Sequence, residues 1–286
     1  MTLDLAPLDG KFTYEVKGLE IWSGLDDRQV RTLDDAWSNQ GVLVFRRQAL
    51  SEEELVNFSV RFGTPDVIVR TDWASHRHPE ITQISNMRDA EGATIGGLGS
   101  SELDWHTDQS YMVEPATGAI LYGVEVPEDG PQTYWANLQL AYDALPEVTK
   151  ERIEGRRAIF SYAERYKDYK DESVPDEEIQ AQTPDVTHTL VHTHPVSGAK
   201  ALYLDPTTMI GIEGMDEAEG RALLDELTEH ATRPEFVYRH DWQPGDLIMW
   251  DNGFLLHRRD AFRTDQNRLL KRTTIRLSPD RHIVPG

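Results

Sequence analysis

The stretch Trp105-His106-Thr107-Asp108 places two potential metal ligands at alternate positions. In a β-strand, residues i and i+2 point to the same side, so His106 and Asp108 can reach one ion while Thr107 faces away. His257, near the other end of the chain, supplies a second imidazole. Two imidazoles and one carboxylate that converge occupy one face of a metal and leave the opposite positions open, as in non-haem Fe(II) oxygenases. The stretch therefore predicts a strand-borne metal site that the fold completes with His257.

Strand and helix signals around this stretch indicate a mainly β fold. Runs typical of strands, or of strands joined by a turn, occur at 41–45, 81–86, 119–124, 190–204, 246–250 and 268–277. Helical spacing and capping residues predict helices over 26–39 and after Ser51 and Asp216. Because strands and helices do not alternate regularly, we expect a β-sandwich or barrel with helices packed outside.

Length and composition limit the organisation of the chain. With 286 residues, the chain is long enough for one large domain, and we expect residues 1–286 to form a single domain. The polar segment 165–185 is expected to be an exposed insertion or lid. No apolar run is long enough to span a membrane, and the first residues lack the pattern of a secretion signal, so a cytoplasmic location is expected.

Charge and cysteine content exclude several kinds of site. The net charge of −21 argues against a nucleic-acid groove, because binding phosphates needs a basic surface. The absence of cysteine excludes disulfides, thiolate ligands and a cysteine nucleophile. Any metal must therefore be held by nitrogen and oxygen ligands, which suits Fe(II), Mn or Zn.

Two arginines near the C-terminus suit the binding of anions. Arg268 and Arg272 are four apart on a predicted strand and therefore lie on the same face. The far carboxylate of a 2-oxo acid bound to iron needs a fixed cation, and an arginine forms a planar two-pronged salt bridge. Arg268 is the candidate for this role, with the Thr133 hydroxyl as a second donor. Arg272 is then the candidate for an anionic group of the substrate.

The order and spacing of these pieces resemble the taurine dioxygenase / 2,4-dichlorophenoxyacetate dioxygenase family of Fe(II)/2-oxoglutarate enzymes. The matching stretches are 41–45, 105–108, 190–195, 235–240, 244–252, His257 and 268–272. The resemblance implies a double-stranded β-helix (jelly roll, cupin-like) with flanking helices, and Fe(II), 2-oxoglutarate and O2 as cofactor and co-substrates. It assigns iron to His106, Asp108 and His257, 2-oxoglutarate to Thr133 and Arg268, and an anionic substrate to Arg272.

Three further residues are candidates for the substrate pocket. The resemblance places Tyr203 there. Glu102 and Gln109 differ from the residues that the taurine enzyme has at their positions, which argues against taurine as the substrate. An acid and an amide would suit a substrate with hydroxyl or amine groups, although both side chains could instead face solvent.

The expected reaction is the oxidation of a C–H bond in a small, anionic molecule, coupled to decarboxylation of 2-oxoglutarate to succinate and CO2. Because Asp108 is present, where related halogenases have a small residue, the resemblance favours hydroxylation, desaturation or ring formation. A zinc hydrolase or isomerase with Glu102 as base, and a non-catalytic binding protein, are the alternatives. Hydrolysis does not require Arg268 and Thr133. Relatives are often dimers or tetramers, so a homodimer or homotetramer is expected.

Most other histidines are expected to be structural. His192 and His194 form a rival H-x-H pair, but no carboxylate triplet lies nearby. We interpret His188, His230, His240 and His282 as surface or hydrogen-bonded core residues. Arg258 and Arg259, directly after His257, are expected to form surface ion pairs.

Overall fold

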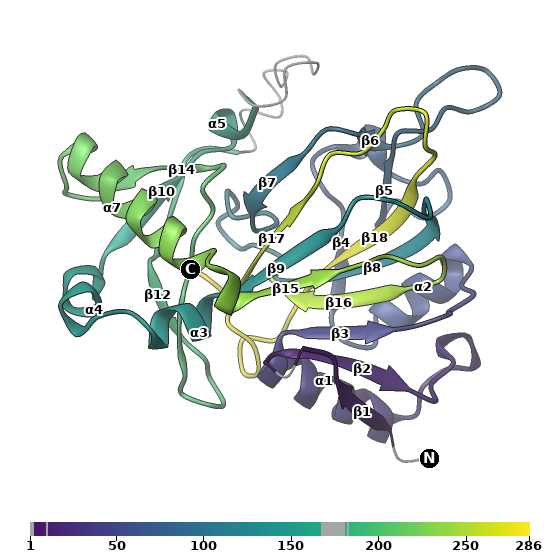
Figure 1. Ribbon diagram of the computed structural model, residues 1–286, viewed down its shortest axis with the longest axis horizontal. Coiled ribbons are helices and arrows are strands. Elements are labelled where there is room, and N and C mark those ends of the chain that lie inside the picture. Colours follow the sequence, from purple (N-terminus) through teal and green to yellow (C-terminus); the bar gives the residue numbers. More distant parts are fainter. Residues whose placement is uncertain (1–2, 10, 167–180, 182) are drawn as a thin grey trace.

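The computed structural model describes residues 3–9, 11–166, 181 and 183–286. Two largely antiparallel sheets form the barrel-like part of the fold (Figure 1). The larger sheet has the order β1 (Asp4–Pro7), β2 (Thr13–Lys17), β3 (Val42–Phe45), β16 (Leu247–Asp251), β8 (Gly118–Glu125), β18 (Leu269–Arg276), β5 (Ile81–Ser85) and β6 (Gly97–Leu98), and β4 (Thr64–Asp66) pairs with β18. The smaller sheet has the order β15 (Val237–His240), β9 (Thr133–Asn137), β17 (Leu255–Arg259) and β7 (Leu103–His106).

Helices and two small sheets flank these strands. In Figure 1, α1 (Asp27–Gln40) and α2 (Glu52–Ser59) lie beside the larger sheet. The remaining elements gather at the other end of the molecule. They are α3 (Leu138–Asp143), α4 (Glu147–Ile153), α5 (Tyr162–Tyr166) and α7 (Glu217–Ala231), a sheet of β11 (Val186–Thr189), β10 (Arg157–Phe160) and β14 (Met209–Ile212), and a hairpin of β12 (Val191–Thr193) and β13 (Lys200–Leu202). Short 3-10 turns are η1 (Ile21–Ser23), η2 (Thr71–Trp73) and η3 (Pro234–Phe236).

The continuous apolar strand β3 is buried on both faces, because alternate side chains enter two different cores. Val42 and Val44 face the cluster between the two sheets, which also contains Trp135 of the smaller sheet. Leu43 and Phe45 face a second cluster, formed with the helices α1 and α2. The outer face of the larger sheet is therefore covered by helices, and its inner face packs against the smaller sheet.

A third cluster covers the smaller sheet on its other side. Ala136 of β9 and Leu256 of β17 join it from the sheet, and Leu223 and Leu227 join it from α7. The two sheets with helices outside confirm the expected mainly β jelly-roll core.

The helix boundaries follow the sequence signals closely. Asp26 and Ser51 both act as N-caps with complete capping boxes, and Asp216 caps α7. The second helix ends at Ser59, and Phe62 just beyond it packs in the core.

The expected insertion or lid at 165–185 lies mostly outside the described residues. No helix in the described part of the chain combines the length and apolar character needed to cross a bilayer.

Candidate metal and co-substrate site

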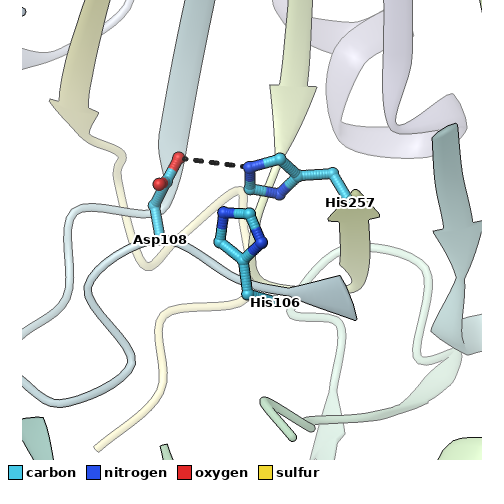
Figure 2. Close-up of side chains that lie close together, drawn as sticks. All are labelled: His106, Asp108 and His257. Atoms are coloured by element: carbon cyan, nitrogen blue, oxygen red, sulfur yellow. Dashed lines mark ion pairs between the residues drawn. The ribbon is translucent and has the colours of Figure 1, made fainter. Parts of the chain in front are cut away.

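His106, Asp108 and His257 converge at one end of the smaller sheet (Figure 2). His106 ends β7 and lies directly across from His257 on β17, with the two ring centroids 4.1 Å apart. Oδ2 of Asp108 lies 3.9 Å from Nε2 of His257. One ligand atom from each residue lies within 4.8 Å of the others, and all three side chains are buried. In the described part of the chain, this is the one such cluster.

The hydrogen bonds of the two imidazoles fit a metal site. Nδ1 of His106 lies 2.7 Å from the carbonyl oxygen of Asp104, so Nδ1–H donates and Nε2 keeps a lone pair for a ligand bond. Nδ1 of His257 is buried and has no hydrogen-bond partner among the described residues. Because buried polar atoms are normally paired, this nitrogen marks His257 as more than a packed core histidine.

Burial and charge fix the protonation states of the three side chains. Burial lowers the pKa of His257 to about 4 and holds the pKa of His106 well below its usual value. Burial alone would raise the pKa of Asp108, but Arg272 and the two imidazoles more than offset this, so its pKa is lowered. At neutral pH the site therefore presents two neutral imidazoles and one carboxylate, the states that bind a divalent cation.

Asp108 reaches the site from a loop and is held there by other side chains. Nη1 of Arg272 donates to Oδ1 of Asp108 at 2.6 Å. Nδ2 of Asn252 lies 3.4 Å from Oδ2, and the amide oxygen of Asn252 accepts from Nε1 of Trp250 at 2.8 Å. One carboxylate oxygen is thus used by Arg272, and the other faces His257. The positioning contact from Asn252 was not predicted, although the sequence pattern included Trp250-Asp251-Asn252.

Thr133 and Arg268 are both neighbours of Arg259 on β17, Thr133 through strand pairing and Arg268 through its charge interaction. Arg268 is only 2 % exposed, and its Nε has no hydrogen-bond partner among the described residues. Burial, helped by the charge of Arg259, lowers the pKa of Arg268. Thr133 is the register partner of Arg259, and its hydroxyl accepts from Nε1 of Trp242 at 2.8 Å. The hydroxyl proton of Thr133 is then left to donate, so this region offers a cation and a donor to an anion.

The expected surface position of Arg259 is wrong. Arg259 is buried, and its Nη2 donates to the carbonyl oxygens of Leu98, at 3.1 Å, and Ser101. The reason is the period of β17: because His257 points inward, so does Arg259, while Arg258 points outward. The sequence already held this signal: a residue two positions after the inward-facing His257 on a strand must also face inward.

Glu102 is not brought to the site. Its side chain is exposed, and its carboxylate pairs with Arg258 at 3.3 Å. This position leaves the zinc hydrolase alternative without its proposed base. The ion pairs of Arg258 with Glu102 and Asp260 agree with the expectation for Arg258.

A pocket opens beside Asp108, and two of the expected substrate residues line it. The lining residues are Ile68, Val69, Arg70, Trp73, Leu98, Asp108, Gln109, Tyr111, Tyr162, Arg165 and Arg272. Gln109 lines this pocket but uses both ends of its amide within the protein. Its Nε2 donates to Asp66 at 3.0 Å, and its Oε1 accepts from the backbone N–H of Ala116 at 2.9 Å.

Tyr203 is buried in the cluster behind the smaller sheet, where its ring packs near Phe160 and His188. Burial first, and then the charges of Asp205 and Asp108, raise the pKa of Tyr203 well above its usual value. Its phenol therefore stays protonated within electrostatic reach of the Asp108 carboxylate.

Six histidines away from the site have hydrogen-bond partners, as expected. Nε2 of His194 contacts the Ser38 hydroxyl at 3.0 Å, whereas His192 contacts Thr189, so the two do not form a metal pair. Four further histidines bond to carbonyl or carboxylate oxygens: His188, His230, His240 and His282.

Comparisons with known proteins agree with this geometry. A family model described as "Taurine catabolism dioxygenase TauD, TfdA family" matches residues 4–274. The chain is 33 % identical to the alpha-ketoglutarate-dependent 2,4-dichlorophenoxyacetate dioxygenase of Burkholderia sp. (strain RASC), covering 98 % of both chains. It is 32 % identical to a pentalenolactone F synthase of Streptomyces avermitilis, covering 90 % of this chain and 88 % of the relative. A crystal structure of AAD-2 in complex with Mn(II) and N-oxalylglycine superposes with a TM-score of 0.82 at 32 % identity, covering 97 % of this chain and 98 % of that one.

Proposed function

The chain belongs to the TauD/TfdA family of dioxygenases, and we propose that it oxidises a C–H bond of a small anionic organic molecule. As a member, it is an oxidoreductase that uses Fe(II), 2-oxoglutarate (alpha-ketoglutarate) and O2. The reaction proposed here converts 2-oxoglutarate to succinate and CO2 while the substrate is oxidised. The observation that carries the proposal is the buried cluster of two neutral imidazoles and one carboxylate beside a pocket that contains arginines.

His106, Asp108 and His257 would hold the iron. Their buried nitrogen and oxygen atoms and their protonation states fit a divalent metal. When bound, the metal supplies the redox chemistry that couples O2 and 2-oxoglutarate to oxidation of the substrate. Asp108 would hold the metal through its carboxylate, of which Oδ1 is already bonded to Arg272 and Oδ2 faces His257. Retention of this carboxylate favours hydroxylation, desaturation or ring formation over halogenation.

Arg268 and Thr133 would bind the distal carboxylate of 2-oxoglutarate. A buried guanidinium loses its solvation, so an anion that pairs with it recovers part of that free energy. The unpartnered Nε of Arg268 and the remaining proton of the Thr133 hydroxyl are donors suited to one carboxylate. A hydrolase would have no use for such a pair, and this supports the oxygenase over the zinc alternative.

Arg272 would meet the anionic group of the substrate. Its Nη1 is bonded to Asp108, but its Nε has no hydrogen-bond partner among the described residues, so one edge of the guanidinium remains for an oxyanion. Gln109, which lines the same pocket, would shape the surroundings of this contact, whereas Tyr203 is buried behind the smaller sheet. Glu102, exposed and paired with Arg258, is not part of the proposal. We also propose that the protein forms a homodimer or homotetramer, which light scattering tests.

The proposed function is tested with purified protein under anaerobic conditions. Fe(II) and 2-oxoglutarate together should produce a weak visible charge-transfer band, and air with a suitable substrate should then release succinate. His106→Ala should abolish both signals while leaving the thermal unfolding curve cooperative. The matched control is His76→Ala. It removes an exposed histidine from the loop after η2 and should behave as the unaltered protein. Failure of the unaltered protein to bind 2-oxoglutarate in the presence of Fe(II) would refute the proposal.

A further inference from the structure

Arg165 lies in the wall of the same pocket as Asp108 and Arg272. It comes from α5, the short helix that follows β10, far in sequence from both. The pocket beside the metal ligands is therefore bordered by a cation that the sequence pattern did not include.

The remaining wall of the pocket is aromatic and apolar. The rings of Tyr111 and Tyr162 lie with their centroids 4.4 Å apart, and Tyr162 belongs to the same helix as Arg165. Trp73 lies on the same wall, with the guanidinium of Arg70 4.2 Å above its ring. In a chain with a net charge of −21, this is a local concentration of arginines and aromatic rings. Such a lining fits a ligand with an apolar body and a negatively charged end.

Arg272 alone leaves part of an oxyanion unbound. A carboxylate or sulfate has more acceptor positions than one edge of a guanidinium can fill. Nη1 of Arg272 is already used to hold Asp108 at 2.6 Å. A second guanidinium in the same wall can donate to the positions that Arg272 does not reach.

We propose that Arg165 is a second anion-binding residue of the substrate pocket. The substrate would present one oxyanion, a carboxylate, sulfonate or sulfate, to Arg165 and Arg272 together, and its apolar body would lie against Tyr111 and Tyr162. The inference rests on the proposed function, since it describes the substrate side of that site. Arg165 binds and orients the substrate and takes no part in holding 2-oxoglutarate.

The test measures binding of two anionic probes, phenoxyacetate and hexyl sulfate, to the protein loaded anaerobically with Fe(II) and 2-oxoglutarate. Calorimetric titration should show that Arg165→Gln weakens probe binding on the order of 10- to 100-fold, the usual effect of losing a charge-assisted hydrogen bond. Arg165→Lys should recover part of this loss, because it restores the positive charge. The affinity for 2-oxoglutarate should not change in either variant.

The matched control is Arg152→Gln, which removes the same charge from an exposed arginine paired with Glu226 on the outside of the molecule. It should bind both probes as the unaltered protein does. Equal probe affinity in Arg165→Gln and the unaltered protein would overturn the proposal. So would a failure of both probes to bind the unaltered protein when 2-oxoglutarate does bind, a result that leaves the proposed function standing. Loss of 2-oxoglutarate binding in Arg165→Gln would show that Arg165 has a structural role, and this too would overturn the proposal that Arg165 binds the substrate.

Discussion

His282 makes the stability of the protein depend on pH above neutrality. The imidazole is buried between two carboxylates: Nδ1 lies 2.7 Å from Asp251, and Nε2 lies 3.1 Å from Asp34. Arg281 adds a positive charge to Asp34 from the neighbouring position. Burial alone would lower the pKa of His282, but the two carboxylates raise it to about 9. The folded protein therefore carries an imidazolium that ties the C-terminal segment to α1 and to the end of β16.

The raised pKa of His282 determines the direction and the size of the change in stability with pH. The folded pKa of about 9 lies above the unfolded value of 6.5, so the stabilisation is fully present below pH 6.5. It is lost as the pH rises through the folded pKa. Each unit of difference is worth about 1.4 kcal/mol, so the contribution is about 3 kcal/mol. His282→Gln keeps a polar side chain at this position but removes the group that gains and loses a proton.

The assay is urea unfolding of the unaltered protein and of His282→Gln at a series of pH values. The difference between their free energies of unfolding should be largest and constant below about pH 6.5 and should shrink by about 3 kcal/mol by about pH 10. Taking the difference removes the contributions of groups that titrate in both proteins. A difference that stays constant over this range would show that His282 is uncharged in the fold, and the reasoning would fail.

Three other predictions concern the site. Asn252→Ala should weaken Fe(II) binding about 10-fold in a metal titration, because the amide that positions the Asp108 carboxylate is lost. Arg268→Gln should raise the Kd for 2-oxoglutarate on the order of 10- to 100-fold, measured through the anaerobic visible band, and leave Fe(II) affinity unchanged. Arg259→Ala should lower the free energy of unfolding by about 2 kcal/mol in urea, because it releases the carbonyl groups of Leu98 and Ser101.

Arg258→Gln is the matched control for the two arginine variants. Arg258 is the outward-facing neighbour on β17, and its ion pairs are partly exposed, so all three measurements should change little. Unaltered Fe(II) affinity in Asn252→Ala, unaltered 2-oxoglutarate affinity in Arg268→Gln, or unaltered stability in Arg259→Ala would contradict the corresponding argument.

The cluster of candidate metal ligands could be predicted from the sequence because its geometry is partly local. The two-residue spacing of His106 and Asp108 holds in the structure, although the strand itself ends at His106 and Asp108 follows in a loop. His257 could be chosen only from the resemblance and the order of the motifs, since the pairing of β7 with β17 is a long-range contact. The helices that cover the larger sheet were predicted well because capping and helical periodicity are local signals.

Side-chain direction at the edge of the site was harder to predict. Glu102 and Gln109 are close in sequence to the ligands, yet one is exposed and the other is held in a left-handed backbone conformation with φ of 56°. Neither property follows from a residue's distance along the chain from a ligand. The position of Arg165 could not be predicted either, because its place in the pocket wall depends on long-range contacts that bring α5 beside Asp108 and Arg272.

The contact between Arg272 and Asp108 would link the proposed binding of a metal by Asp108 to the proposed binding of an oxyanion by Arg272. A guanidinium that withdraws charge from the carboxylate makes it a weaker electron donor to a cation. An oxyanion that pairs with the remaining edge of Arg272 would offset part of its positive charge, so Asp108 would donate more strongly to the cation. By thermodynamic reciprocity, loading the cation would in turn favour capture of the oxyanion. Because both sites share the Arg272 guanidinium, the bound cation would raise the affinity for the oxyanion, and the bound oxyanion would raise the affinity for the cation.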